Sequence, residues 1–443
     1  MINQIIILLV LAGCIPRLGT PRLKRYLLGC GIFTIPFSYD YTLYAFTAAP
    51  FMGWTEGVLV SLSQVFFGLI LVLCRRVKSS PNGVAPARFC MDWPIGAFLI
   101  TAFISMLFPI DRKCALVAVI TLSMNAFLFY WVITRYCSWE EDGEFILRCF
   151  AVAVIFQACL AMWQAAFQTG FYFFRTGSPP MLTGDEDYMR SQGTTPQPNG
   201  FAGYLNLVMI PLFAGWLVWK SPDRRLLKVA LAMGGIALMT SLSRGGWMAL
   251  LAGVLFVFFH SGSRRWVRPV LLTTAVFVLI VALVPQLRER VTGDDGGSAQ
   301  DRWKLAQIAT GMIADHPILG VGINNYRLAM WSYVPENYDW KFVYRVHTLP
   351  LLILAEMGIV GFAGLCWLFW RGITMGRRLF APPENIEAWI AIGAAGACVA
   401  TLLHSFVDVV WTSPSINAQF FATLGIGALA SRAASKTAIP TAS

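Results

Sequence analysis

Long apolar runs separated by short polar connectors make up most of this chain, and they predict a bundle of membrane-spanning helices. About 20 apolar residues are needed to cross the hydrocarbon core as a helix. The predicted spans are 54–74, 92–109, 114–134, 144–168, 200–219, 226–241, 246–259, 269–285, 347–370, 386–407 and 414–431. Segment 26–48, interrupted by Pro36 and Asp40, is a further predicted span. The predicted fold class is therefore an all-α polytopic membrane protein with about twelve transmembrane helices and one long loop.

The same pattern divides the chain into four parts. Residues 1–285 are a predicted transmembrane bundle of about nine spans with one polar external segment, 171–199. Residues 286–346 are the long loop with short interfacial helices, and 347–431 return to transmembrane helices. Residues 432–443, which are mostly small, are predicted to be a disordered tail.

Two local features refine this division. The run 226–259 is predicted to be a helical hairpin pinched at Ser243-Arg244-Gly245-Gly246. Within the loop, apolar residues at helical spacing predict a helix over 300–314 that lies along the membrane. The sequence Asp315-His316-Pro317 ends it, because proline disfavours helix at the residue before it.

Basic residues set the orientation, since cytoplasmic connectors carry an excess of lysine and arginine. The connectors near residues 17–25, 75–78, 220–225, 264–268 and 371–378 are basic and all fall on one side of the predicted bundle. That side is the cytoplasm, so 171–199, the 243–246 pinch and the long loop share the external face. Both termini are cytoplasmic if residues 2–15 do not cross. If they cross, there are thirteen spans and an external N-terminus; fourteen residues are short for a span, which favours twelve.

Composition supports a membrane protein and narrows its chemistry. The 443 residues are 57% hydrophobic and 13% charged, with a mean hydropathy of +0.63. The net charge of +11 lies largely in the connectors, so the orientation rule explains it and no nucleic-acid partner is expected. Nearly all of the ten cysteines fall in or beside apolar spans without a CxxC pair, so neither a metal site of thiolates nor a disulfide framework is predicted.

The candidate chemistry lies on the external face. Arg190, Arg244 and Arg302 stand in three separate external segments, and a guanidinium fork suits phosphate oxygens. Each arginine taken singly is equally well explained as an interfacial residue or an ion pair. His347 stands at the entrance of a span, where an imidazole suits a general base; a capping or interfacial histidine is the alternative. Glu356 is predicted to make a buried structural hydrogen bond, because it faces the other side of the helix, about 13 Å deeper.

Three weaker patterns favour structural interpretations. Asp185 and Asp187 form a DxD, which some sugar transferases use to hold a cation, but a solvated acidic loop is favoured and no metal or cofactor is predicted. His404 and Asp408, one turn apart, are predicted to share a hydrogen bond rather than a metal. The segment from Gly320 to Tyr326 is predicted to be a tight turn between loop helices.

Taken together, ordered motifs over roughly 190–365 resemble the superfamily of O-antigen ligases and O-antigen polymerases. They are Pro198-Asn199-Gly-Phe-Ala-Gly-Tyr-Leu after Arg190, Thr240-Ser-Leu-Ser-Arg-Gly-Gly-Trp247, Asp301-Arg302-Trp, Asp315-His-Pro-Ile-Leu-Gly-Val-Gly-Ile-Asn-Asn-Tyr326 and His347-Thr-Leu-Pro-Leu-Leu-Ile-Leu-Ala-Glu-Met-Gly-Ile-Val-Gly361. Thr348 stands where the family often has Asn or Ser, and the first 180 residues match only in being apolar.

The resemblance implies a multi-span glycosyltransferase of the bacterial inner membrane, with its site on the periplasmic face and its C-terminus in the cytoplasm. Such enzymes transfer a glycan from undecaprenyl pyrophosphate, and the ligases join it to lipid A–core without metal or nucleotide. The essential arginines and histidine map onto Arg190, Arg244 or Arg302, and His347. Asn199, His316, Asn324 and Tyr326 are predicted to support them. The hypothesis is a single inverting step in which arginines hold the pyrophosphate and His347 deprotonates the acceptor.

The alternatives within the family are a polymerase and a protein O-oligosaccharyltransferase, and the single large loop favours a ligase. A flippase for lipid-linked sugars would need charged residues inside several helices. These spans mostly lack such charges, so transport is the distant alternative. Acceptor, donor repeat and oligomeric state are left open.

Overall fold

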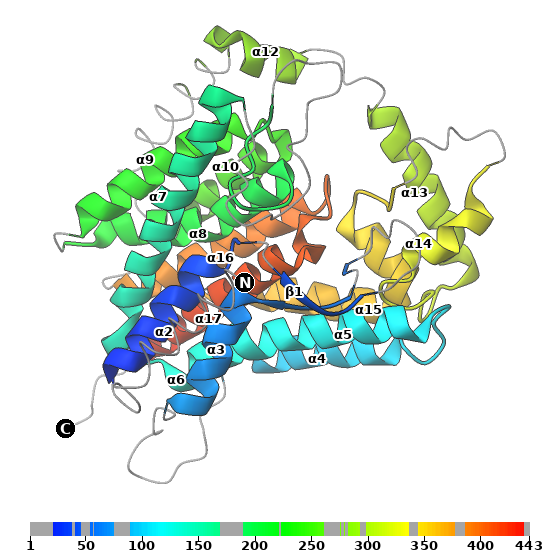
Figure 1. Cartoon of the computed structure of the whole chain (residues 1–443), viewed down its shortest axis with the longest axis horizontal. Coiled ribbons are helices and arrows are strands. Elements are labelled where there is room, and N and C mark those ends of the chain that lie inside the picture. Colours follow the sequence, from blue (N-terminus) through cyan, green and yellow to red (C-terminus); the bar gives the residue numbers. More distant parts are fainter. Residues whose placement is uncertain are drawn as a thin grey trace.

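The computed structural model shows a bundle of helices of very unequal length (Figure 1). It describes residues 21–37, 40–45, 54–55, 57–74, 89–168, 189–220, 223–260, 282–292, 298–335, 344–376 and 386–437, with the single positions 275 and 279. The predicted span 269–285 lies largely outside these residues. So do the acidic pair Asp185 and Asp187 and residues 2–15.

The N-terminal part contains a β-hairpin where helix was predicted. Helix α2 (Pro21–Thr34) ends before Pro36, and β1 (Asp40–Ala45) then pairs antiparallel with β2 (Gly57–Ser61), placing Asp40 opposite Ser61. The predicted spans 26–48 and 54–74 are therefore wrong as continuous helices. The β-branched and aromatic residues of both strands favour extended backbone. Ser61 then starts α3 (Leu62–Leu73) through a capping box with Gln64.

Longer helices follow, close to their predicted places. They are α4 (Asp92–Ile104), α5 (Arg112–Asn125), the π-helix η2 (Ala126–Trp131), α6 (Val132–Tyr136), the π-helix η3 (Trp139–Gly143), α7 (Glu144–Phe167), α8 (Pro198–Val218), α9 (Arg224–Thr240) and α10 (Arg244–His260). α5, η2 and α6 form one continuous apolar helix, as do η3 and α7. The predicted hairpin is confirmed, because α9 ends at Thr240 and α10 begins at Arg244.

The loop and the C-terminal part contain α12 (Pro285–Thr292), α13 (Ser298–Asp315), α14 (Tyr326–Ala329), the 3-10 turn η5 (Met330–Tyr333), α15 (Leu349–Ile373), α16 (Ile386–His404), the 3-10 turn η8 (Val410–Thr412) and α17 (Pro414–Thr437). The predicted loop helix is present as α13, which ends at Asp315 ahead of Pro317. Its position along the membrane stays a prediction. α17 continues to Thr437, so residues 432–437 are helical and the prediction of disorder from 432 onward is wrong there.

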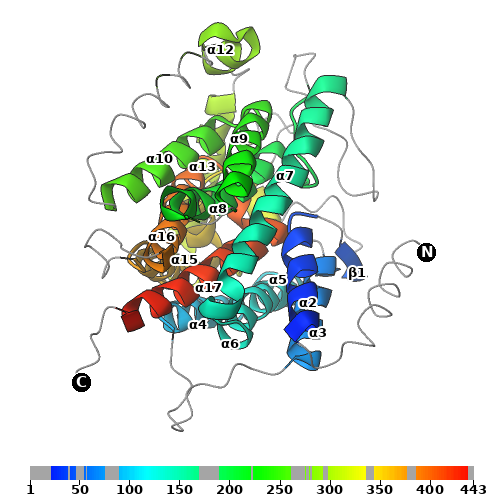
Figure 2. The same ribbon diagram turned by 90° about the vertical axis from the view of Figure 1, so that its left-hand side faces the viewer.

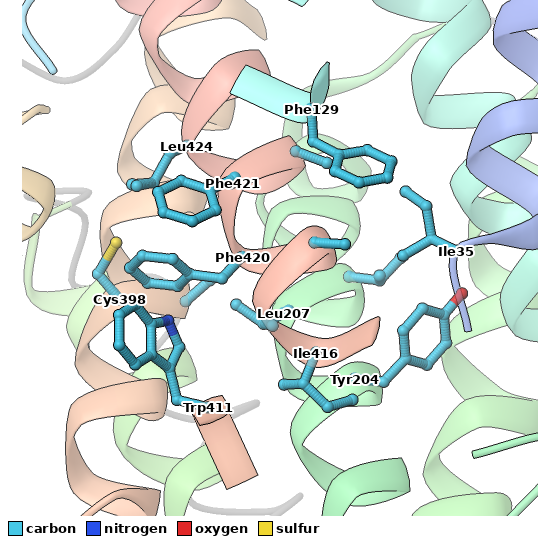
Figure 3. Packing of buried hydrophobic residues seen from close by; sticks show 14 of the residues in the cluster. Ile35, Phe129, Tyr204, Leu207, Cys398, Trp411, Ile416, Phe420, Phe421 and Leu424 are labelled. Carbon is cyan, nitrogen blue, oxygen red and sulfur yellow. The ribbon is translucent and has the colours of Figure 1, made fainter. Parts of the chain in front are cut away.

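α16 and α17 lie at the centre of the bundle. Figure 2 shows α8, α9 and α10 on one side of them and α2 and α3 on another. α8, α10 and α16 approach closely at Gly253 and Gly396, where a Cβ on Gly253 would come within 2.9 Å of the Gly396 carbonyl oxygen. Small residues of this kind allow membrane helices to pack backbone to backbone. Aromatic side chains fill the middle of the core, with Phe420 edge-on to Trp411 (Figure 3).

α15 is broken at Gly358, and the segment after α13 docks into the break. Gly358 has φ of 63° and ψ of −165°, a conformation that favours glycine. The backbone N–H groups of Val321 and Gly322 donate to the carbonyls of Ala355 and Glu356, each at 2.9 Å. A Cβ at Gly320, whose φ is 67°, would overlap the backbone at Glu356. The long loop is therefore fastened to the helix that begins just after His347.

The described helices fit a membrane protein. Among the described residues, five helices are long and apolar enough to cross a membrane: Arg112–Tyr136, Trp139–Phe167, Pro198–Val218, Leu349–Ile373 and Ile386–His404. The shorter apolar helices are Leu62–Leu73, Asp92–Ile104 and Arg244–His260. A helical, multi-pass membrane protein is thus supported, while twelve spans, the orientation and the domain boundaries stay predictions.

Candidate functional site

Arg190 joins the segment before α8 to the turn between α9 and α10. Its Nε donates to the Ser241 carbonyl at 3.0 Å, and its Nη2 donates to the Asn199 Oδ1 at 2.7 Å and to the Leu242 carbonyl at 3.4 Å. The neighbouring Ser191 N–H donates to the Thr240 carbonyl. Two of the segments that the sequence predicted to share one face are therefore in direct contact.

Asn199 extends this connection to the end of α16. It stands in the first turn of α8, directly after Pro198, a residue that suits the first helical position because it needs no N–H partner there. Its Nδ2 donates to the Asp408 Oδ2 at 2.5 Å. The other carboxylate oxygen of Asp408 accepts from the Val409 N–H at 2.7 Å.

Asp408 in turn faces His347. The His347 Nδ1 lies 3.6 Å from the Asp408 Oδ1, and the side chain of His347 is one-third exposed while that of Asp408 is 13% exposed. Burial opposes ionisation of Asp408. The charges of His347 and His404 and the Asn199 amide outweigh it, so the pKa of Asp408 is held well below its usual range. An ionised carboxylate therefore stands beside the imidazole.

The turn that opens α10 completes this group. Gly245 packs against the imidazole of His404, because a Cβ there would lie 3.0 Å from the His404 Cδ2 and 2.7 Å from the Val407 Cγ2. Arg244, the preceding residue, is half-buried and has no hydrogen-bond or ion-pair partner among the described residues. A half-buried guanidinium of this kind is suited to bind an anion.

Arg345, two residues before His347, adds a further cation. Burial lowers the pKa of its guanidinium, while the carboxylates of Glu356 and Asp408 oppose that shift. Arginine stays charged in proteins. Its charge therefore acts on both carboxylates, and one of them, Asp408, faces the imidazole.

Glu356 forms a separate anchoring cluster with Trp54, Asn324 and Tyr326. Its carboxylate accepts from the Trp54 Nε1 at 2.7 Å and from the Tyr326 N–H at 3.2 Å. The Asn324 side chain accepts from the Trp54 N–H at 2.7 Å and donates to the Cys114 carbonyl at 3.1 Å. The predicted structural hydrogen bonding of Glu356 is confirmed, and so is the predicted turn at 320–326. Asn324 and Tyr326 hold the loop in place; neither contacts His347.

The remaining predicted residues lie elsewhere. Arg302 and His316 are exposed on and just after α13, and no described hydrogen bond or ion pair joins either to His347. Helix α13 stands apart from α7–α10 in Figure 1. His404 and Asp408 share the backbone bond from the Asp408 N–H to the His404 carbonyl at 2.9 Å; no side-chain hydrogen bond between them is present. Among the described residues, no cluster of three or more metal-ligating side chains occurs.

Sequence reasoning missed the partnership of Asp408 with His347 and the position of Arg345. The two partners of the His347–Asp408 pair are 61 residues apart, and no local spacing encodes their contact. The only available signal was an acidic residue at the external end of an apolar span, which requires a partner there.

Comparison with known families agrees with this geometry. Residues 229–366 match the family of O-antigen ligase domains. This match supports a relationship to the O-antigen ligase superfamily. The matched region covers less than a third of the chain and includes Arg244, Arg302 and His347, whereas Arg190, Asn199 and Asp408 lie outside it. Among curated proteins, none matches the chain.

The match supports a glycosyltransferase-like enzyme, an O-antigen ligase or polymerase, acting in lipopolysaccharide assembly in a membrane. Lipid-linked glycan and lipid A–core are the partners that such a family implies in general. The matched region contains both His347 and Arg244. Asp408, from outside that region, faces His347, and Asn199 donates a hydrogen bond to Asp408.

Proposed function

We propose that this protein is an O-antigen ligase of the bacterial inner membrane. It transfers a polysaccharide from undecaprenyl pyrophosphate to lipid A–core on the periplasmic face, in one inverting step that needs no metal. The observation that carries the proposal is the contact chain from Arg190 through Asn199 and Asp408 to His347, beside the half-buried Arg244.

In this proposal His347 is the general base. Its Nδ1 faces Asp408 at 3.6 Å, an arrangement that favours a proton on Nδ1 and leaves Nε2 free to accept one. The Nε2 removes the proton from the acceptor hydroxyl, and that oxygen attacks the anomeric carbon. Asp408 stabilises the imidazolium that results, as a carboxylate partner does in catalytic triads.

Arginines bind the leaving group. As the new glycosidic bond forms, the bond between the anomeric carbon and the pyrophosphate oxygen breaks, and its electron pair stays on the carrier pyrophosphate. Arg244 has no described protein partner, so it is the proposed principal contact to this developing charge. Arg190 contributes positive charge and holds the site together. Arg302 stays a predicted pyrophosphate ligand that enters from α13.

The first test uses full-length protein in lipid nanodiscs with undecaprenyl-pyrophosphate-linked glycan and lipid A–core. His347→Ala should lower the transfer rate by about 10²–10⁴-fold, the usual contribution of a general base. Arg244→Gln should raise the donor KM and lower kcat. Arg225→Gln, which removes a charge at the far end of α9, is the matched control and should transfer normally.

The products decide between the members of the family. Glycan on lipid A–core identifies a ligase, longer chains on the carrier identify a polymerase, and glycan on protein identifies an oligosaccharyltransferase. Normal transfer by His347→Ala would refute the base, and loss of transfer on adding EDTA would refute the metal-free step.

A further inference from the structure

An exposed group of aromatic residues with one arginine adjoins His347. We call Arg327, Trp331 and Tyr344 the aromatic ledge. Trp331 is 46% exposed and Tyr344 is 39% exposed. The Arg327 guanidinium carbon lies 5.8 Å from the centre of the Trp331 ring, and Tyr344 acts electrostatically on the same guanidinium. One cation therefore lies near the exposed Trp331 ring and within electrostatic range of Tyr344.

The ledge is fixed to the rest of the protein. Arg327 stands in α14, whose first residue, Tyr326, donates its N–H to Glu356 and its hydroxyl to the Leu305 carbonyl at 3.4 Å. Asn325 ends the preceding turn and accepts from the Asp111 N–H at 2.6 Å. Rigid supporting contacts of this kind are what a binding surface needs, because the side chains lose little further freedom when a ligand binds.

The ledge is also continuous with the proposed general base. The ring centres of Tyr344 and His347 lie 6.5 Å apart, and only two residues separate them in sequence. Arg190 and Arg244, the proposed pyrophosphate ligands, belong to other parts of the chain, the segment before α8 and the first residue of α10. The ledge therefore stands beside the imidazole on the α14 side, where the sugar that gives up its proton has to be held.

We propose that the aromatic ledge binds the acceptor saccharide, with a pyranose ring against Trp331 or Tyr344 and an anionic substituent of that saccharide on Arg327. This inference rests on the proposed function and assigns the acceptor side of the same site. The face of an aromatic ring carries partial negative charge, which attracts the polarised C–H groups on the flat side of a sugar. The guanidinium fork binds phosphate or carboxylate oxygens in pairs.

The competing occupant is the lipid headgroup region, where tryptophan and tyrosine are commonly enriched. Two observations favour the saccharide. Trp331 lies near the Arg327 cation and Tyr344 lies near the imidazole, whereas the more exposed Trp303, at 67%, stands on α13 without a described contact to either. Trp303 is therefore the matched control for an effect of aromatic residues on membrane binding.

The experiment measures separate KM values for donor and acceptor in nanodiscs. Tyr344→Ala and Trp331→Ala should each raise the acceptor KM about three- to tenfold, the range expected from losing one aromatic contact, and leave the donor KM unchanged. Tyr344→Phe, which retains the ring, should raise the acceptor KM less than Tyr344→Ala does. Arg327→Gln should weaken binding of the phosphate-bearing acceptor and have little effect after phosphatase treatment of that acceptor.

Direct binding provides the second measurement. In the His347→Ala background, deacylated lipid A–core oligosaccharide should show saturation-transfer NMR signals that weaken when Tyr344 or Trp331 is replaced by alanine. An unchanged acceptor KM and unchanged signals in the ledge variants would overturn the proposal, as would equal effects from Trp303→Ala. These results leave the dependence of transfer on His347 intact, so failure of the ledge is distinguishable from failure of the proposed function.

Discussion

Replacing Asp408 by asparagine tests how the carboxylate supports His347. The substitution keeps the shape of the side chain and its capacity to bond with Asn199, but it removes the negative charge 3.6 Å from the imidazole. It also turns an acceptor into a group that can donate to Nδ1. A donor at that position favours the tautomer with its proton on Nε2, which cannot act as the base.

The expected loss follows from the distance. Two unit charges 3.6 Å apart interact by about 4.6 kcal/mol at an effective dielectric of about 20. Water screens part of this, because the side chain of His347 is one-third exposed, and about half or less should remain as stabilisation of the imidazolium. A loss of about 1.4–2.3 kcal/mol lowers kcat by about 10- to 50-fold. Asp408→Ala should lose this charge contribution without the unfavourable tautomer, so asparagine should be the worse replacement.

The assay is steady-state transfer in nanodiscs, with kcat, both KM values and the pH–rate profile measured for each variant. The donor KM should stay near the parent value, since Asp408 does not contact the pyrophosphate in the proposed site. The acid limb of the profile should move to lower pH, because the carboxylate no longer stabilises the protonated imidazole. Asp223→Asn removes a comparable ion pair, with Arg148 at 2.6 Å, at the other end of α9. It controls for general effects on the fold.

A normal kcat in Asp408→Asn, together with an inactive His347→Ala, would refute the role of the carboxylate. Equal losses in the asparagine and alanine variants, without movement of the acid limb, would show that Asp408 acts only through packing.

Two further predictions concern stability. The pKa of Asp408 is depressed in the folded protein, so its ionised carboxylate stabilises the fold above the ordinary carboxyl pKa of about 3.9, and this stabilisation is lost as the pH falls through the folded value. The difference in Tm between parent and Asp408→Asn, measured in detergent, should therefore be constant from about pH 8 to 5 and shrink below about pH 4. A difference that grows in acid would contradict this sign. At Gly358, φ is 63° and a Cβ would overlap the Ile318 carbonyl, so Gly358→Ala should destabilise by about 2 kcal/mol or more. The control is Gly235→Ala, at a helical position with open space around it, which should be neutral or stabilising by up to about 1 kcal/mol. If both glycine variants changed the free energy of chemical unfolding equally, the role of the break in α15 would be refuted.

Hydropathy predicted the helices well where an apolar run was long. The spans that became α7, α8, α15 and α16 lie close to their predicted limits, and the hairpin at 243–246 was found from its glycines and polar residues. The run 54–74 failed because a short apolar segment rich in β-branched residues has no period that separates strand from helix. The helix to Thr437 was missed because small residues are typical of a disordered tail but also favour helix when packed.

The site was predictable in its residue types and its face, but not in its contacts. Arg190 and Asn199 were identified from external motifs, and the structure joins them to His347 through Asp408. The sequence predicted that Asp408 pairs with His404, four residues away, because spacing along a sequence predicts contacts only within one helix. The true partner comes from another element, and tertiary packing alone places it.

The break in α15 explains how a long loop can position a catalytic imidazole. His347 lies two residues before α15 begins, and Glu356, two residues before Gly358, binds Trp54 and Tyr326. The first turns of α15 are thus fixed at their deep end by the loop and at their outer end by the bond from the Leu349 N–H to the Ser405 carbonyl at 2.8 Å. Ser405 is three residues before Asp408 on the same turn. The bond between Leu349 and Ser405 therefore holds together the two segments that carry the imidazole and its carboxylate. The segment after α13 fixes the position of α15, the helix that follows His347.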